Sequence, residues 1–339
     1  MSRTTRPRSS VDGQGSFPLV GLGATAIDPS LSVGEVAYAV LRKQFAALVK
    51  NEPGTRLGSD PKPLHDMRVA DRRLRAAMSL FRDSLPARMP LLRSQLRWVM
   101  QGLGPVRELD VQLQQLEDWS NEDLSRQLEA IAALRELLQQ ERAEARAGLL
   151  GMLDSLRYAR LLERLAMLLR TGPSARSAPS RVPILVAGPA LVRRRYRALR
   201  KAGDRIGDGA EASEFHRVRI QGKRFRYTLE FLADVYPGQV EPLIPRLVAL
   251  QDLLGVQQDS DVAVTRLRAL AGRTDRGLSP VSVFAFGMLA ERYAQRGRDL
   301  RASFPDVYAK VRGRPWKELR RNLKERMPVR APAAPGSPA

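Results

Sequence analysis

Residues 64–86 read LHDMRVADRRLRAAMSLFRDSLP, and residues 215–237 read FHRVRIQGKRFRYTLEFLADVYP. The two stretches match at an offset of 151 residues, which aligns the two histidines of the chain, His65 and His216. The same offset, without a gap, pairs Leu103, Gly104, Asp110 and Val111 with Leu254, Gly255, Asp261 and Val262. Arginine-rich helices that match by chance would not keep one register over this distance. The sequence therefore predicts two related halves.

The rest of the chain has a helical pattern. Leu, Ala, Arg, Glu and Gln dominate it, with apolar residues three and four positions apart, as in IAALRELLQQERAEARAGLLGMLDSL from Ile131. Alternating β-branched runs are nearly absent. We expect an all-α fold in which two internally repeated, four-helix-bundle-like halves pack with pseudo-two-fold symmetry and turn equivalent helices toward one shared cleft.

Composition predicts the domain boundaries. Residues 1–30 mix Gly, Ser, Pro and Arg, residues 328–339 are nearly all Pro, Ala, Gly and Ser, and both ends are expected to be disordered tails. The segment 171–189 carries four prolines and two glycines. We interpret it as a linker between a first repeat, 31–170, and a second repeat, 190–327.

The charge balance points to a polyanionic partner. The chain has 339 residues, with 57 Lys and Arg against 36 Asp and Glu, and a formal net charge of +21. Charge alone does not separate nucleic acid, an acidic membrane surface and a phosphate polymer. The absence of cysteine excludes a disulfide framework and a Cys-ligated metal, and two histidines argue against a His-based metal centre. We expect no cofactor and no metal.

Each histidine shares one helix face with several cations, and apolar residues occupy the opposite face. The cationic stripes, as we call them, are His65, Arg68, Arg72, Arg73 and Arg75 in the first repeat and His216, Arg219, Lys223, Arg224 and Arg226 in the second. The opposite faces carry Met67, Leu74, Met78, Phe81 and Leu85, and Val218, Phe225, Leu229 and Leu232. Like charges one turn apart repel, so folding alone gives no reason for two such stripes. Arginine donors suit phosphate oxygens, and we predict that the stripes bind a phosphate polymer.

The stripes also have a simpler interpretation. Each would be a solvated helix face, or a set of cations paired with the nearby acids Asp66, Asp71 and Glu230. The duplication with identical spacing favours the ligand site. The two histidines are expected to open their helices, where free backbone N–H groups attract an anion. We favour a phosphate contact, with protonation enhanced by the anion, or a hydrogen bond that shapes the cleft, over a purely structural role.

Asp110 and Asp261 are repeated as well. Paired carboxylates are compatible with a metal ion or a general base. Each follows a glycine-containing segment that we interpret as a turn before a helix, so capping of that helix or pairing with a stripe arginine is the favoured role.

Further basic segments are weaker candidates, because no repeat register fixes their direction. They either widen the cleft or form exposed solubilising faces. These candidates are Arg42, Lys43, Arg194, Arg195, Arg197 and Lys201. The run WKELRRNLKER from Trp316 is open to the same two interpretations.

The N-terminal residues MSRTTRPRSS are basic but are not followed by the apolar region of a signal peptide. The most apolar stretches, near 182–192 and 281–290, are much shorter than the roughly 20 residues that a membrane-spanning helix needs. We expect no membrane association and a cytoplasmic protein.

The two histidine motifs, HxxRVxxRRLR and HxxRIxxKRFRYxLEF, resemble those of the CHAD family (conserved histidine α-helical domain), as do the LG and Asp-Val pairs and the Arg-Pro-Trp near Pro315. The resemblance covers roughly residues 31–327. It implies two helical bundles around a basic central groove or pore, lined by the two stripes, and binding of inorganic polyphosphate without catalysis, often at polyphosphate granules. Many members of the family carry an attached triphosphate-tunnel domain with a Glu-x-Glu-x-Lys strand. This sequence lacks that motif, so a stand-alone domain is expected. Gly222 departs from its counterpart Asp71, and we interpret it as a site of close backbone approach.

Two other classes of function are weaker. A polyphosphate-processing enzyme would need a phosphate-binding loop or a dense carboxylate set for magnesium, and the sequence has neither. A nucleic-acid-binding protein fits the charge, but aromatic residues are only 6% of the chain, too few to build the stacking platforms that bind single strands. Non-specific nucleic-acid binding is expected at low salt only. The sequence leaves the oligomeric state open.

Overall fold

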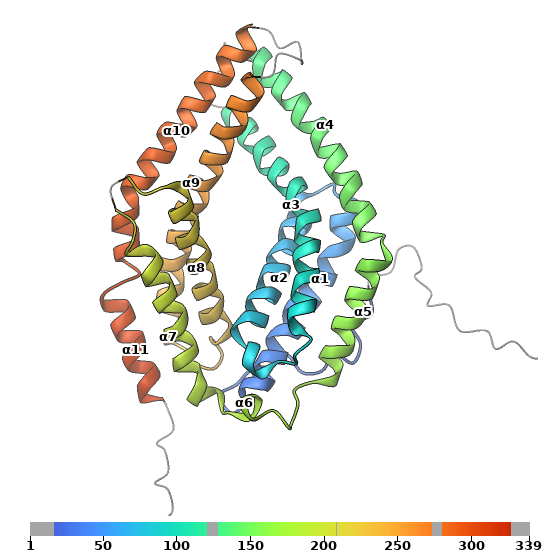
Figure 1. The fold of residues 1–339 in the computed structure, drawn as a ribbon, viewed down its shortest axis with the longest axis vertical. Helices are drawn as coiled ribbons and strands as arrows, with labels where there is room; N and C mark the ends of the chain where they lie inside the picture. The colour runs from blue at the N-terminus through green and yellow to red at the C-terminus, as the bar shows by residue number, and fades with distance from the viewer. Residues whose placement is uncertain (1–16, 121–127, 208, 273–279, 327–339) are drawn as a thin grey trace, which may run out of the picture.

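The computed structural model describes residues 17–120, 128–207, 209–272 and 280–326. These residues form helices and no β-strand (Figure 1). The first half holds α1 (Val33–Leu57), α2 (Pro61–Leu80), α3 (Met89–Ser120), α4 (Leu128–Leu153) and α5 (Leu156–Thr171), with the 3-10 turn η1 (Arg82–Ser84). The second half holds α7 (Ile184–Gly203), α8 (Ala212–Phe231), α9 (Ile244–Ala271), α10 (Pro280–Ala309) and α11 (Arg314–Glu325), with the turn η3 (Glu241–Leu243); the short α6 (Ala178–Arg181) joins the halves. The all-α prediction is confirmed, while the repeat and its symmetry stay predictions.

The helices are arranged as an elongated ring (Figure 1). The tips of α4 and α10 meet at one end, α6 lies at the other end, and α2 and α8 contact each other in the middle. Long antiparallel neighbours, α1 with α2, α3 with α4, α7 with α8 and α9 with α10, form the walls. None of the described helices is both long and apolar enough to span a membrane.

The main apolar core lies behind the two histidine helices. Met67 and Leu74 of α2 and Val218 and Phe225 of α8 are fully buried in it, which confirms the predicted apolar faces. A second, smaller apolar core forms where α3, α4, α9 and α10 come together, and it includes Leu134, Leu138, Leu267, Phe286 and Leu289. The main core therefore orients the cationic faces of α2 and α8, and the small core closes the ring.

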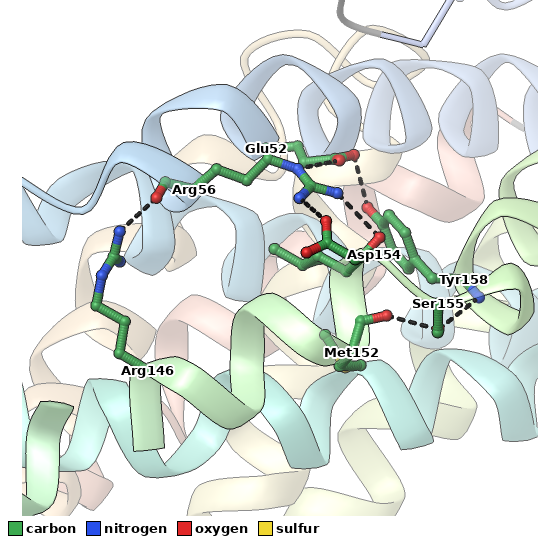
Figure 2. Close-up of polar contacts among 8 residues, drawn as sticks. Glu52, Arg56, Arg146, Met152, Asp154, Ser155 and Tyr158 are labelled. Atoms are coloured by element: carbon green, nitrogen blue, oxygen red, sulfur yellow. Dashed lines mark hydrogen bonds and ion pairs between the residues drawn. The ribbon is translucent and has the colours of Figure 1, made fainter. Parts of the chain in front are cut away.

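Side chains fix the joint between α1, α4 and α5 (Figure 2). Arg56 forms ion pairs with Glu52, one turn earlier in α1, and with Asp154, between α4 and α5. Arg146 of α4 donates to the carbonyl of Arg56, one of the carbonyls that the end of α1 leaves free. The buried Tyr158 hydroxyl donates to Glu52 at 2.9 Å, and its burial raises the pKa of Tyr158. This joint holds α4 and α5 against α1.

Two predicted boundaries need correction. The chain is not disordered over 17–30, because Phe17 packs edge-on against Phe45 with ring centroids 6.0 Å apart and Leu22 is buried. These apolar residues are scattered among glycines, so their burial leaves no periodic signal in the sequence. The linker 171–189 also contains α6 and the start of α7, and it pairs with the start of α1 through a bridge between Ser32 and Pro183. Residues 1–16 and 328–339 lie outside the described residues.

Candidate anion-binding site

The histidine faces of α2 and α8 line one cavity of about 440 Å³. α3 and α9 complete its walls, so four helices from both halves contribute side chains. Its basic residues, which we call the cavity cluster, are His65, Arg68, Arg72, Arg107, His216, Arg219 and Lys223. The other lining residues are Glu108, Val111, Gln112, Gln115, Gln258, Asp259 and Val262. Six of the ten predicted stripe residues therefore meet in one place.

Two glycines lie behind the deepest arginines, and the one at position 104 makes room for its neighbour. A Cβ at Gly104 of α3 would lie 3.3 Å from Nη1 of Arg68, and one at Gly255 of α9 would lie 4.0 Å from Nη2 of Arg219. Both glycines are inside helices, so the predicted turns at these positions are wrong: the glycines serve side-chain packing. Burial lowers the pKa of Arg68 to about 10 and lowers the pKa of Arg219.

Buried donors in the cavity lack acceptors. Nη1 of Arg68 and Nε of Arg219 are inaccessible to solvent and have no hydrogen-bond partner among the described residues. Burying such a group unsatisfied costs free energy, and a negative charge in the cavity would offset that cost by attracting the whole guanidinium group. The geometry thus favours a negatively charged occupant.

Lys223 and His65 carry the titratable charge of the cavity. Burial lowers the pKa of Lys223 to about 7, with further lowering by Arg219 and Arg72. Burial also lowers the pKa of His65, followed by the effect of Arg107. Burial therefore shifts both groups toward their neutral forms, and a bound anion would shift them back toward their charged forms.

The histidines do not open their helices as predicted. α2 begins at Pro61 and α8 at Ala212, so His65 and His216 both lie in the second turn. The helix starts are capped by Asp60 and by Glu211, which forms a capping box. His216 Nδ1 lies 2.8 Å from Oε1 of Gln258, a hydrogen bond that fixes the ring at the cavity wall.

A second group of cations lies outside the cavity. Besides burial, the charges of Arg75 of α2 and Arg224 of α8 lower the pKa of Arg93 of α3, and the charges of Arg224 and Arg93 lower the pKa of Arg195 of α7, so these residues share one region. We call these four residues the arginine cluster. Burial lowers the pKa of Arg195 to about 10 and lowers the pKa of Arg93; the charged neighbours that lower them further are all arginines. Arg75 also donates to the buried Asp71 at 2.7 Å.

The remaining stripe arginines, Arg73 and Arg226, are ion-paired. Both bind the carboxylate of Glu230, Arg73 through Nη2 and Arg226 through Nη1 at 3.5 Å. Their guanidinium carbons lie 5.4 and 5.3 Å from the ring centre of Tyr227. We call this arrangement the Glu230 bridge. The simpler interpretation, pairing with nearby acids, thus applies to part of the stripes, while Asp66 pairs with Lys62 instead.

Asp110 and Asp261 do not cap helices, because both lie inside long ones. Asp110 accepts from Arg142 of α4 at 2.7 Å, and Asp261 accepts from Arg301 of α10 at 2.8 Å. Neither partner belongs to a stripe. The described residues contain no group of three or more His, Asp or Glu arranged to hold a metal ion.

The weaker candidates separate into different roles. Arg42 donates to the carbonyl of Leu169 at 3.1 and 2.7 Å and ties α1 to α5, away from the cavity lining. Arg195 belongs to the arginine cluster, and Arg194 donates to the carbonyl of Leu80 at 2.9 Å. Lys43, Arg197 and Lys201 are exposed and do not line the cavity.

The repeat comparison missed the basic residues of α3. The offset of 151 residues places Ile244 opposite Arg93 and Gln258 opposite Arg107, so neither arginine is duplicated. Fourteen residues separate Arg93 from Arg107, close to four helical turns, which puts them on one face. A helical wheel of this segment would have identified them.

No other backbone segment of the described part of the chain lies close to Gly222. A Cβ there would meet Gln251 Cγ at 3.9 Å and Leu199 Cδ1 at 4.0 Å, which are ordinary contacts. The expectation was wrong because the two neighbours are flexible side chains and not backbone.

Comparisons with known proteins agree with this architecture. The family model described as CHAD domain matches residues 39–268. The crystal structure of the CHAD domain from the plant Ricinus communis is 30% identical, with a TM-score of 0.66, over 85% of this chain and 96% of that one. PptA from Streptomyces chartreusis has the same TM-score at 19% identity, over 82% of this chain and 99% of that one, a likeness of fold alone.

Two uncharacterized proteins of Mycobacterium tuberculosis, from strains CDC 1551 and H37Rv, are each 29% identical over 245 residues. The match takes in 68% of this chain but 44% of each relative, so the chain spans less than half of their length. Since the family model covers most of the described helices, including both histidine helices, the chain belongs to the CHAD domain family.

Proposed function

We propose that the protein binds inorganic polyphosphate, without catalysing a reaction on it, and that it associates with polyphosphate granules through this binding. The observation that carries the proposal is the cavity cluster, in which basic side chains from three helices, α2, α3 and α8, converge and buried donors of Arg68 and Arg219 lack acceptors among the described residues. Membership of a family linked to polyphosphate binding supports the same ligand.

A polymer fits this arrangement better than a single phosphate. Arg68 of the cavity cluster and Arg75 of the arginine cluster are seven residues apart in α2, about 10 Å along the helix. A chain with closely spaced charges can occupy both clusters at once and gain from multivalency. A single phosphate can occupy only one.

The proposal is tested by competition. Long-chain polyphosphate is titrated against the protein at about 150 mM salt, with DNA and RNA as competitors at equal phosphate concentration, where loosely organised electrostatic binding is weak. We expect polyphosphate to displace both nucleic acids. Preference for DNA or RNA would support nucleic-acid binding instead, and release of inorganic phosphate by the purified protein would show an enzyme.

A further inference from the structure

The two edges of the α2–α8 contact are chemically different. On one edge Arg73 and Arg226 share the single carboxylate of Glu230, which offsets one of their two positive charges. On the other edge Arg75 and Arg224 approach Arg93, in the arginine cluster. The offset of 151 residues relates these pairs to each other, because it carries Arg73 onto Arg224 and Arg75 onto Arg226.

Two substitutions between the halves change the balance of charge. The buried Asp71, which pairs with Arg75, has Gly222 at the equivalent position, and Ser79 has Glu230. The offset carries Ser79 onto Glu230, so the first half has a hydroxyl where the second has a carboxylate. The Ser79 hydroxyl lies in the arginine cluster, where Arg195 Nη2 donates to it at 3.3 Å. Ser79 adds no negative charge there, and its counterpart Glu230 holds two guanidinium groups.

Glu230 holds these arginines as a phosphate would. Its side chain is only 18% exposed, and each carboxylate oxygen forms an ion pair with an arginine of a different helix, one from α2 and one from α8. Arg226 is also among the charges that lower the pKa of Lys223, after burial, Arg219 and Arg72, so the bridge adjoins the cavity. An anion leaving the cavity on this edge would have to displace a carboxylate that is tethered in place and therefore present at high effective concentration.

We propose that Glu230 makes the polyphosphate path one-sided: the chain extends from the cavity toward the arginine cluster, and the internal carboxylate closes the opposite edge. The inference rests on the proposed function and concerns the route of the polymer over the same site.

The test removes the carboxylate from one edge, adds one to the other edge, and does both together. Binding of long-chain polyphosphate and of tripolyphosphate is measured by calorimetry for Glu230→Gln, Ser79→Glu and the double variant. Glu318→Gln is the matched control, because Glu318 also pairs with an arginine one turn away, Arg314, but on the exposed α11.

Opening the closed edge should raise long-chain affinity in Glu230→Gln by about fivefold, the effect of one ion pair near the surface. Ser79→Glu should lower it by a similar factor, and the double variant should return to the wild-type value. Tripolyphosphate, which is short enough to stay in the cavity, should change no more than in the control.

Three results would overturn the inference: a Glu230→Gln variant that matches the control, one that binds long chains more weakly, or an equal gain for tripolyphosphate. Thermal unfolding shows whether each variant is folded. If Ser79→Glu does not fold, Glu230→Asp replaces it; this variant keeps the charge, withdraws the carboxylate by one carbon–carbon bond, and should give a smaller increase than Glu230→Gln. Wild-type protein that binds no polyphosphate would contradict the proposed function itself.

Discussion

The cavity cluster and the arginine cluster share the helices α2, α3 and α8, with α7 adding Arg195 to the second, but they differ in chemistry. The cavity combines arginines with Lys223 and two histidines, and the acids Glu108 and Asp259 share its walls. The basic groups of the arginine cluster are all guanidinium groups, which stay charged at any physiological pH, and one of them, Arg75, pairs with the buried Asp71. The basic groups of the cavity therefore include one, Lys223, that titrates near neutral pH, whereas the basic groups of the arginine cluster do not.

The largest expected effect is the loss of polyphosphate affinity when charges are reversed, and it should differ between the two clusters. Arg68→Glu with Arg219→Glu should lower long-chain polyphosphate affinity by about 100-fold at 150 mM salt, because buried donors become acceptors. Arg195→Glu with Arg224→Glu should cost about tenfold, because this cluster holds only the part of the chain outside the cavity. Lys317→Glu with Arg320→Glu, on the exposed face of α11, is the control of equal charge change. Unchanged affinity in a folded cavity variant would contradict the site assignment.

The second effect is pH dependence. The pKa of Lys223 is lowered to about 7 by burial and by its neighbours Arg219, Arg72 and Arg226, opposed by Asp259. Below pH 7 the ammonium is already charged, whereas above it binding must take up a proton. Affinity should therefore fall by up to about tenfold from pH 7 to pH 8. Lys223→Met should bind more weakly but with a flatter profile, and the Arg195/Arg224 variant should keep the wild-type slope. Calorimetry in buffers of different ionisation enthalpy counts the protons.

A smaller effect distinguishes the two glycines behind the cavity arginines. Gly104→Ala places a Cβ 3.3 Å from Nη1 of Arg68, so the guanidinium must shift, and polyphosphate affinity should fall about two- to threefold. Gly255→Ala meets Arg219 at 4.0 Å, an ordinary contact, and should leave affinity unchanged. Equal losses in both variants would show that the helix backbone, and not the guanidinium position, matters.

The last variant, Gly222→Ala, should leave polyphosphate binding unchanged. Gly222→Ala has room for its methyl group and lies within α8, where glycine is less favourable than alanine by up to about 1 kcal/mol. The variant should unfold at a higher denaturant concentration and bind polyphosphate as the wild type does. A loss of stability would mean that the new methyl group is closer to Gln251 and Leu199 than the distances of 3.9 and 4.0 Å indicate.

The helical wheel explains how much of the site the sequence could predict. With His65 at zero, Arg68 and Arg72 lie within about 60° of it and reach the cavity, and the same angles bring Arg219 and Lys223 there. The residues at about 80°, on the stripe edges, are the ones that leave it. They are Arg73, Arg75, Arg224 and Arg226.

The partners of the edge residues come from elsewhere in the chain. Arg93 and Arg195 reach the arginine cluster from α3 and α7, and Glu230 joins Arg73 across two halves. The sequence gives the direction of each side chain on its own helix, but the tertiary packing decides which neighbour it meets. The all-α fold needed only the periodicity, whereas the corrected tail at 17–30 depends on isolated apolar contacts such as that of Phe17 with Phe45.

If the protein binds polyphosphate as proposed, the unpartnered donors of Arg68 and Arg219 would link the lifetime of the protein to that ligand. Without an anion the folded state bears the desolvation cost of these groups, and the unfolded state does not. By mass action, ligand at 100 times its dissociation constant stabilises the folded state by about 2.7 kcal/mol. Proteases act on the unfolded fraction, so abundant polymer would protect the protein and scarcity would shorten its half-life. The amount of protein would then follow the supply of what it binds, with no separate regulator.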